Sequence, residues 1–412
     1  MTSLLGIVNK ATKVFFDSNS ISVDNWTFKC FYRVTGALCI ASSFLVTARQ
    51  FFGSPVVCDA GAASDGIRPE VLDGYCWMYA TFKIPIEYKG PCASSEQEML
   101  EGIIYNSYYQ WVPIYLFLLS ALFYLPRCLW LIMEGGLMKF FGKGTTTRVI
   151  EDPEEKRDKL VEFFRANIHN KYNIYYFGFM FCELLNVFVV LLAFWLTDKF
   201  LNHRFLAYGF KVYAFYRLPP EEQSIGPFIN PMCYTFPRIS SCNYYRYGTG
   251  GKQESINAIC ILALNIINDK VFLVIWWWFV FLLGVGVTRI FFRSIQVNSA
   301  RLRFYLMKIR MSRFFKRNED MDKIRSYICN CSRGDWFVLY QLSKNLNRPF
   351  FMDFLSKLTR MMEMEKKNPN CKGLDEGDGF FDMMLQPNLR AYTSDDKDDK
   401  DDDDDEEEED KD

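Results

Sequence analysis

The sequence predicts an all-α membrane protein with four transmembrane helices, two disulfide-bonded extracellular loops with minor β structure, and a helical cytoplasmic domain. Three observations predict this fold class: four long apolar stretches, an uneven distribution of Lys and Arg, and cysteines gathered in two loops. The 412 residues are 50% hydrophobic and 17% aromatic, a composition that excludes global disorder.

The first apolar stretch follows a short N-terminal segment, residues 1–30, which contains no apolar run of the signal-peptide kind. Val34 to Ala48 carries no charge and lies between two arginines, and it predicts the first transmembrane helix over residues 31–50. A stretch this short could also form a buried helix in a soluble protein, so this is the weakest of the four assignments.

The other three stretches are longer and more apolar. They predict transmembrane helices over residues 108–131, 172–197 and 270–292. The second and fourth each contain an uncharged run of about 19 residues, the length of helix that crosses the hydrocarbon of a bilayer. The third is interrupted only by Glu183.

Basic residues orient the four spans. The loop of residues 132–171 holds eight Lys and Arg, and residues 293–362 open with a basic run, whereas the loop of residues 51–107 holds three. The positive-inside rule then predicts a multi-pass plasma-membrane protein with both termini in the cytoplasm. The loop of residues 198–269 lies outside on this reading, although it is too long for its own charges to be informative.

Six cysteines fall in the two outer loops: Cys58, Cys76, Cys92, Cys233, Cys242 and Cys260. An even number in an oxidising compartment predicts three disulfides, and 15 connectivities remain open. With two histidines in the chain and no second cysteine pair beside Cys329 and Cys331, we expect no metal site and no cofactor. No paired carboxylates or nucleophile motif indicates a catalytic site.

The net charge of −1 conceals two opposite regions. Residues 395–412 carry a charge of −12 within a segment, residues 363–412, that we expect to be disordered and acidic, and the rest of the chain carries +11. The tail could dock on the basic cytoplasmic helices or remain solvated. No soluble domain supplies base-stacking aromatics, so nucleic acid is not an expected partner. Membrane lipids are expected partners of the basic helices.

A hexapeptide opens the second span: Tyr108-Tyr109-Gln110-Trp111-Val112-Pro113. Within a four-span frame with paired cysteines, it resembles the signature of the innexins, the invertebrate gap-junction channel proteins. Further resemblance lies in Tyr124-Leu125-Pro126-Arg127, Cys182-Glu183-Leu184-Leu185, Phe236-Pro237-Arg238 before Cys242, Cys260-Ile261-Leu262-Ala263-Leu264-Asn265 and Gly334-Asp335-Trp336-Phe337. Together these motifs cover roughly residues 1–360.

The resemblance implies a gap-junction channel subunit. Innexin subunits form rings, octameric in the family's known architecture, from the same or related subunits. Two rings dock between neighbouring cells and pass ions and small molecules. The family joins two cysteines per outer loop, which implies Cys58–Cys260 and Cys76–Cys242 here. Cys92 and Cys233 are additional, and we hypothesise that they form a third bond.

Small polar residues in the first span predict its function. Thr35, Cys39, Ser42 or Ser43, and Thr47 share one helix face, which either borders the pore or lets neighbouring helices pack closely. The resemblance favours the pore, because innexins place the N-terminal segment and the first span along the channel. Residues 2–20 then form a candidate funnel with Asp17 near its entrance.

Two further residues are candidates for structural or gating roles. Pro113 either kinks the second span and acts as a gating hinge, which the resemblance favours, or occupies the first turn of a helix that begins there. Glu183 is the one ionisable residue inside the third span, and a contact to a neighbouring helix is a better interpretation than ion sensing.

Other functions remain as alternatives. A non-junctional hemichannel would release small metabolites through the same pore. A four-span adhesion or scaffold protein is less consistent with the sequence, because the Cys-Cys-Gly motif of tetraspanins and the Trp/Cys pattern of claudins are both missing. An enzyme is the least consistent class.

Overall fold

The computed structural model describes residues 21, 24–61, 67–79, 81–83, 104–106, 108–145, 150, 152–166, 170–221, 230–248, 250–311 and 318–367. They belong to two compact units. The first is built from residues 24–130 and 180–294, and the second chiefly from residues 131–179 and from residue 295 onward. Asp17 and Cys92 lie outside the described residues.

Four long helices carry the predicted spans. The first is continuous over Trp26–Phe52 and consists of α2 (Trp26–Lys29), the π-helical turn η1 (Cys30–Val34) and α3 (Thr35–Phe52). The others are α6 (Val112–Glu134), α9 (Asn170–Phe200) and α13 (Asn265–Asn298). Each is long and apolar enough to cross a membrane, so the four-span prediction is confirmed, including its weakest member.

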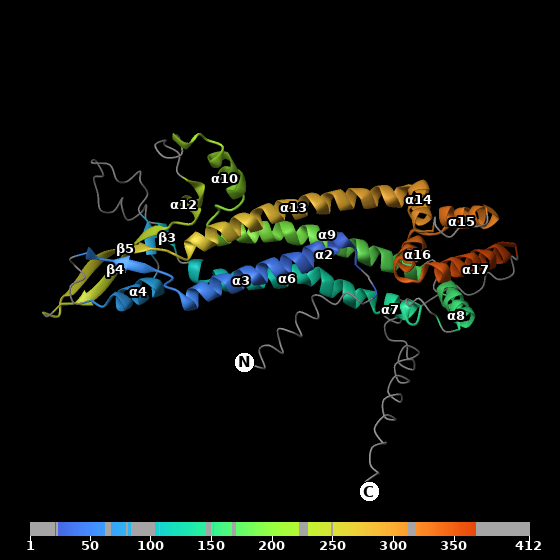
Figure 1. The fold of residues 1–412 in the computed structure, drawn as a ribbon, viewed down its shortest axis with the longest axis horizontal. Helices are drawn as coiled ribbons and strands as arrows, with labels where there is room; N and C mark the ends of the chain where they lie inside the picture. The colour runs from blue at the N-terminus through green and yellow to red at the C-terminus, as the bar shows by residue number, and fades with distance from the viewer. Residues whose placement is uncertain are drawn as a thin grey trace, which may run out of the picture. The chain divides into compact units, whose positions relative to one another are not determined.

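The spans pack against one another in the first unit (Figure 1). Phe279 of α13 meets Phe123 of α6 at a ring separation of 5.5 Å and Phe194 of α9 at 5.3 Å. The α3 helix joins this bundle through Trp278, whose indole donates to Thr35 at 2.8 Å. Since lipid is as apolar as these cores, close packing and inter-helix hydrogen bonds hold such a bundle together.

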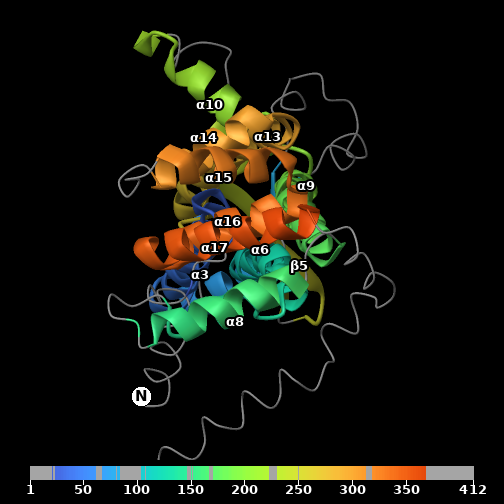
Figure 2. The same ribbon diagram turned by 90° about the vertical axis from the view of Figure 1, so that its right-hand side faces the viewer.

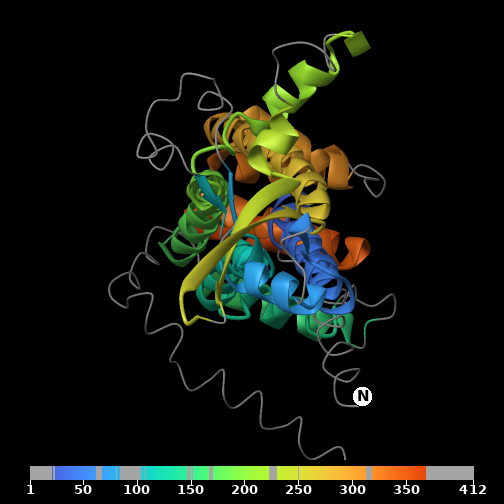
Figure 3. The same cartoon turned by 90° about the vertical axis from the view of Figure 1, so that its left-hand side faces the viewer.

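A five-stranded antiparallel sheet follows the spans in the first unit. Its order is β1 (Val57–Asp59), β5 (Gln253–Ile261), β4 (Ile239–Tyr247), β2 (Thr81–Lys83), β3 (Ile104–Asn106). Strands β4 and β5 form a hairpin, and α4 (Pro69–Met78) packs on it (Figure 3). Two more helices belong to this region, α10 (Tyr208–Tyr216) and α12 (Pro231–Thr235).

The second unit is helical. It contains α7 (Leu137–Gly142), α8 (Pro153–Ala166), α14 (Ala300–Met311), α15 (Asn318–Asn330), α16 (Arg333–Asn345) and α17 (Arg348–Lys367). Helix α17 lies along α8 (Figure 2), with Phe354 against Phe164 at 5.9 Å and Lys357 bonded to Asp158. The described part of the chain is therefore mainly helical with a small sheet, as the sequence predicts.

A close backbone approach joins α16 to the first turns of α9. Gly334 donates its backbone N–H to Asn173 Oδ1 at 2.9 Å. A Cβ at position 334 would lie 2.3 Å from the backbone carbon of Tyr172, so only glycine permits this contact. Phe337 then packs on the rings of Tyr176 and Phe179. The Gly-Asp-Trp-Phe motif is thus a packing motif of the second unit.

Candidate functional site

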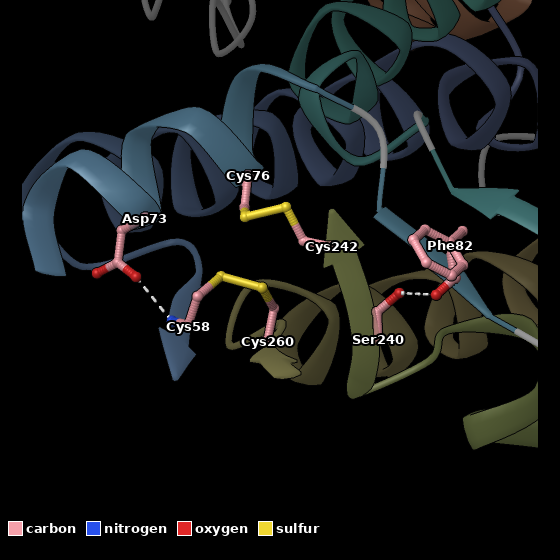
Figure 4. Close-up of a disulfide and its surroundings, with 7 residues drawn as sticks. All are labelled: Cys58, Asp73, Cys76, Phe82, Ser240, Cys242 and Cys260. Atoms are coloured by element: carbon pink, nitrogen blue, oxygen red, sulfur yellow. Dashed lines mark hydrogen bonds between the residues drawn. A yellow bond between two sulfur atoms is a disulfide. The ribbon is translucent and has the colours of Figure 1, made fainter. Parts of the chain in front are cut away.

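Two disulfides join the two outer loops (Figure 4). Cys58 of β1 is bonded to Cys260, its direct partner across the ladder in β5, and Cys76 of α4 is bonded to Cys242 of β4. All four cysteines are buried. The pairing that the family resemblance implies is confirmed. Both loops therefore belong to one cross-linked sheet, which keeps them together outside the spans.

Hydrogen bonds support the same junction. Asp73 Oδ1 accepts from the backbone N–H of Cys58 at 2.7 Å, and Ser240 Oγ donates to the Phe82 carbonyl at 3.0 Å (Figure 4). Sulfur atoms of Cys58, Cys76 and Cys260 lie within 4.8 Å of one another, as metal ligands would. They are oxidised in disulfides, however, and metal binding by cysteine requires thiolates, so this cluster is structural.

The hypothesised third disulfide, Cys92–Cys233, stays a prediction. Cys233 is a free cysteine at the middle of α12, and its suggested partner Cys92 is outside the described residues. The α12 helix is instead held by neighbours within the same unit: Asn230 caps it through a bond to the Met232 N–H at 3.0 Å.

The hexapeptide before the second span fastens the outer loops to that span. Tyr108 and Tyr109 are buried, and the Tyr108 hydroxyl donates to the Thr235 carbonyl at 3.2 Å. Tyr109 packs on Trp77 of α4 with ring centroids 5.0 Å apart, and Gln110 donates to the Trp77 carbonyl. These contacts place the first outer loop and α12 on the end of α6.

Neighbouring apolar side chains of the same hexapeptide differ in exposure. Val112 is fully buried in the bundle, whereas Trp111 keeps 60% of its surface exposed. Tryptophan is enriched at membrane interfaces because its ring is apolar and its N–H is polar. Trp111 fits that position at the end of the span.

Glu183 lies at the centre of a buried polar cluster that connects three elements. Its carboxylate accepts hydrogen bonds from Arg293 Nε at 3.0 Å and Arg289 Nε at 3.4 Å on α13, and from Asn25 Nδ2 at 3.2 Å at the start of α2. Glu183 and Arg293 are 6% and 1% exposed. The interpretation of Glu183 as an inter-helix contact fits this geometry, and its partners are Arg293, Arg289 and Asn25.

A second ion pair connects the start of the first span with α6. Asp24 is buried, bonds to Arg127, and accepts from the Tyr32 hydroxyl at 3.0 Å. Arg127 also lies over the Tyr32 ring, 5.5 Å from its centroid. Ion pairs of this kind are expensive to break in a bundle because the remaining charge is buried without a partner.

The pore-lining assignment in the first span is wrong for its central residues. Thr35, Cys39 and Ser42 are 0%, 0% and 8% exposed within the single protomer, so they cannot border a water-filled pore. They face the bundle, where Thr35 accepts from Trp278. Thr47, partly buried, donates to the Ser43 carbonyl at 2.7 Å. The alternative interpretation, that small residues allow close helix packing, is the better one.

Pro113 does not interrupt the interior of α6, where the interpretation as a kink would place it. Pro113 is the second residue of α6, where the missing N–H has no helical acceptor to lose. The proline inside the helix is Pro126. At position 126 a proline removes the hydrogen bond to the Leu122 carbonyl and favours a bend.

The fold and these sites define a class of protein: a four-span membrane protein whose outer loops are cross-linked into one sheet and whose spans are joined by buried ion pairs. The Innexin family model matches residues 24–362. Innexin inx2 of Drosophila melanogaster is 33% identical over 386 residues, which cover 91% of this chain and all of the relative.

Other relatives agree. Innexin inx2 of Schistocerca americana is 34% identical over 358 residues, covering 84% of this chain and 95% of the relative. Innexin shaking-B of Drosophila melanogaster is 29% identical over 367 residues, covering 86% of this chain and 94% of the relative. The chain belongs to the innexin family, whose members are gap-junction channel subunits.

Proposed function

We propose that this chain assembles with copies of itself or with related innexin subunits into a ring, octameric as in the family's known architecture, and that two rings dock between neighbouring cells. The observation that carries the proposal is the outer sheet. Because the two disulfides join both loops to it, the sheet can present one fixed surface outside the membrane.

That surface has an apolar face available for contact. Along β5 the side chains alternate, so that Ile256, Ala258 and Cys260 are buried while Ile259 and Ile261 are exposed. Ile239 of β4, directly opposite Ile261, is 64% exposed as well. An exposed apolar patch on a cross-linked sheet is typical of a protein-protein contact surface, here with a neighbouring or an apposed subunit.

The topology supports docking outside the cell. Disulfides persist in oxidising compartments, so the sheet is expected on the extracellular side. With four spans, both termini and the helical second unit then lie in the cytoplasm, in agreement with the distribution of Lys and Arg.

Dye transfer tests this function. Paired cells that express the chain are expected to pass a small fluorescent dye, and single cells to take up little of it. Uptake by single cells without transfer would favour a non-junctional hemichannel that releases small metabolites. The absence of both would favour an adhesion or scaffold role.

A hairpin variant separates docking from folding. Tyr247 ends β4 and is 79% exposed, so its truncation removes almost no packing within the protomer. Tyr247→Ala is expected to reduce transfer while leaving surface expression unchanged. Tyr216→Ala, at an exposed tyrosine of the same loop on α10, is the matched control and is expected to leave transfer intact.

A further inference from the structure

Helix α10 exposes an apolar stripe although it belongs to an outer loop. Tyr208, Val212 and Phe215 are buried on one side of it. Phe210 and Tyr213 lie on another face with Ala214, at helical spacing, and are 59% and 50% exposed. A helix in water would not be expected to carry a second apolar face without a partner.

The stripe lies level with part of the apolar run of the fourth span. The Phe210 ring packs edge-on against Trp276 at 4.7 Å and near Trp277 at 6.2 Å, and Tyr213 approaches Trp277 at 6.4 Å. Trp277 is seven residues beyond Lys270, the cation at the start of the apolar run, or about 10 Å along the helix. The first turns of α10 therefore meet the side of α13 and not its end, and α10 leads away from the bundle (Figures 1 and 2).

Specific contacts fix α10 in this place. Trp276 Nε1 donates to the Leu206 carbonyl at 3.1 Å, and buried Asp198 accepts from the N–H groups of Phe205 and Leu206 at 2.9 Å each. A Cβ at Gly209 would lie 2.1 Å from the Trp276 ring. Only glycine allows the helix to approach so closely, so the depth of the stripe is built into the fold.

Cations flank the stripe. Arg217, one residue after α10, places its guanidinium 5.0 Å from the Tyr213 ring centroid, and Lys211 is exposed on the flank of the helix. Apolar residues with aromatic rings and flanking Lys or Arg are the composition of helices that lie in the membrane interface, where the cations meet lipid phosphates. A contact with a neighbouring subunit would not require this combination.

The apolar surface also continues along the span. Trp277 lines a groove on the bundle together with Val34, Leu38 and Val274. The stripe is thus continuous with surface of α13 and the first span that is apolar and exposed, the kind of surface that faces acyl chains. This continuity connects α10 to the membrane-facing part of the protein.

We propose that α10 is an interfacial helix that inserts its Phe210–Tyr213 stripe into the bilayer leaflet on the side of the outer sheet. The second outer loop is therefore anchored to phospholipid as well as to protein. The inference requires only that α13 spans the membrane, and it is independent of docking between cells.

Site-specific photo-crosslinking of the full chain in phosphatidylcholine vesicles tests this anchor. The photoreactive side chain is introduced as Tyr213→p-benzoylphenylalanine. Two reference positions calibrate the yield: Phe281, exposed on the α13 span, and Tyr247, exposed at the hairpin tip. Adducts are identified by mass spectrometry, and a crosslink to a second copy of the chain is detected as a dimer on a denaturing gel.

A phospholipid adduct at position 213 in a yield close to that of position 281 supports the anchor. A yield as low as that of position 247, or a dimer in place of the lipid adduct, overturns it. Adding Gly209→Val is expected to displace α10 from Trp276 and lower the lipid adduct several-fold. An unchanged yield would show that the contact at Gly209 does not set the depth of the helix.

Discussion

Glu183 of α9 and Arg293 of α13 form a buried ion pair, with Arg293 Nε and Nη2 donating to the two carboxylate oxygens at 3.0 and 3.3 Å. Both side chains are at most 5% exposed. The pair joins two spans that are 110 residues apart in the sequence. Together with Asn25, it connects the third and fourth spans to the start of the first.

Breaking this pair is expected to destabilise the bundle strongly. Glu183→Gln leaves the guanidinium of Arg293 buried without its counter-charge, at a cost of about 3–5 kcal/mol. Arg293→Met removes the nearer of the two arginines that contact the Glu183 carboxylate and is also expected to destabilise the bundle. The double variant removes both charges, so its loss should be smaller than the sum of the two.

Thermal unfolding of the full chain in detergent measures this coupling. Arg289→Gln serves as the matched control. Arg289 Nε lies 3.4 Å from the Glu183 carboxylate, and the Arg289 side chain is 23% exposed, so it is the more distant and more exposed partner. Its effect should be the smallest. Additive losses from Glu183→Gln and Arg293→Met would show that the two side chains do not form a pair.

Two prolines of α6 should respond differently to replacement by alanine. Pro126→Ala restores a backbone hydrogen bond to the Leu122 carbonyl and is expected to straighten α6, with a gain of up to about 3 kcal/mol. Pro113→Ala lies in the first turn and should change stability little. Voltage or calcium dependence of the channel current provides a second readout. A larger change in stability or channel current from Pro113→Ala than from Pro126→Ala would indicate that the hinge lies at Pro113.

The close approach at Gly334 predicts a sensitive position in the second unit. Gly334→Ala places a Cβ 2.3 Å from the backbone of Tyr172, which forces α16 and α9 apart and should cost about 1–3 kcal/mol or more. Gly284→Ala is the control, because a Cβ there meets nothing within 4 Å. Equal melting temperatures for the two variants would mean that α16 and α9 do not pack in this way.

The rate of alkylation of Cys331 should continue to rise at a pH where that of an ordinary cysteine no longer changes. Burial raises the pKa of this thiol to about 12, although nearby Arg303 acts in the opposite direction. Only the thiolate reacts, so the rate should keep rising about tenfold per pH unit well above the ordinary pKa of about 8.5. Cys329 on α15 is the internal reference in the same peptide map. A Cys331 rate that reaches a plateau near pH 9 contradicts the burial of the thiol.

The four spans could be predicted from sequence because hydropathy and length are local properties of a segment. Every predicted span lies in a helix that is long and apolar enough to cross a membrane. The pairs Cys58–Cys260 and Cys76–Cys242 required the family resemblance, since the number of cysteines leaves the connectivity open.

Features that depend on contacts between spans could not be predicted from the sequence. Thr35 and Cys39 are small and polar enough for either a pore wall or a helix contact, and only their burial in the folded bundle shows that they are covered. The partners of Glu183 lie on α13 and at the start of the first span, so no local pattern indicates them. Of the two interpretations of Pro113, the structure fits a proline in the first turn, because α6 begins one residue before it, and a sequence pattern indicates helix boundaries poorly.

The most direct test of the account is the junctional conductance between two cells, each expressing only this chain in a host without channels of its own. We expect a conductance that requires expression in both cells and is lost when external reductant opens the two disulfides of the outer sheet. A pair without conductance, despite the protein at the contact between the cells, would contradict the assignment as a gap-junction subunit.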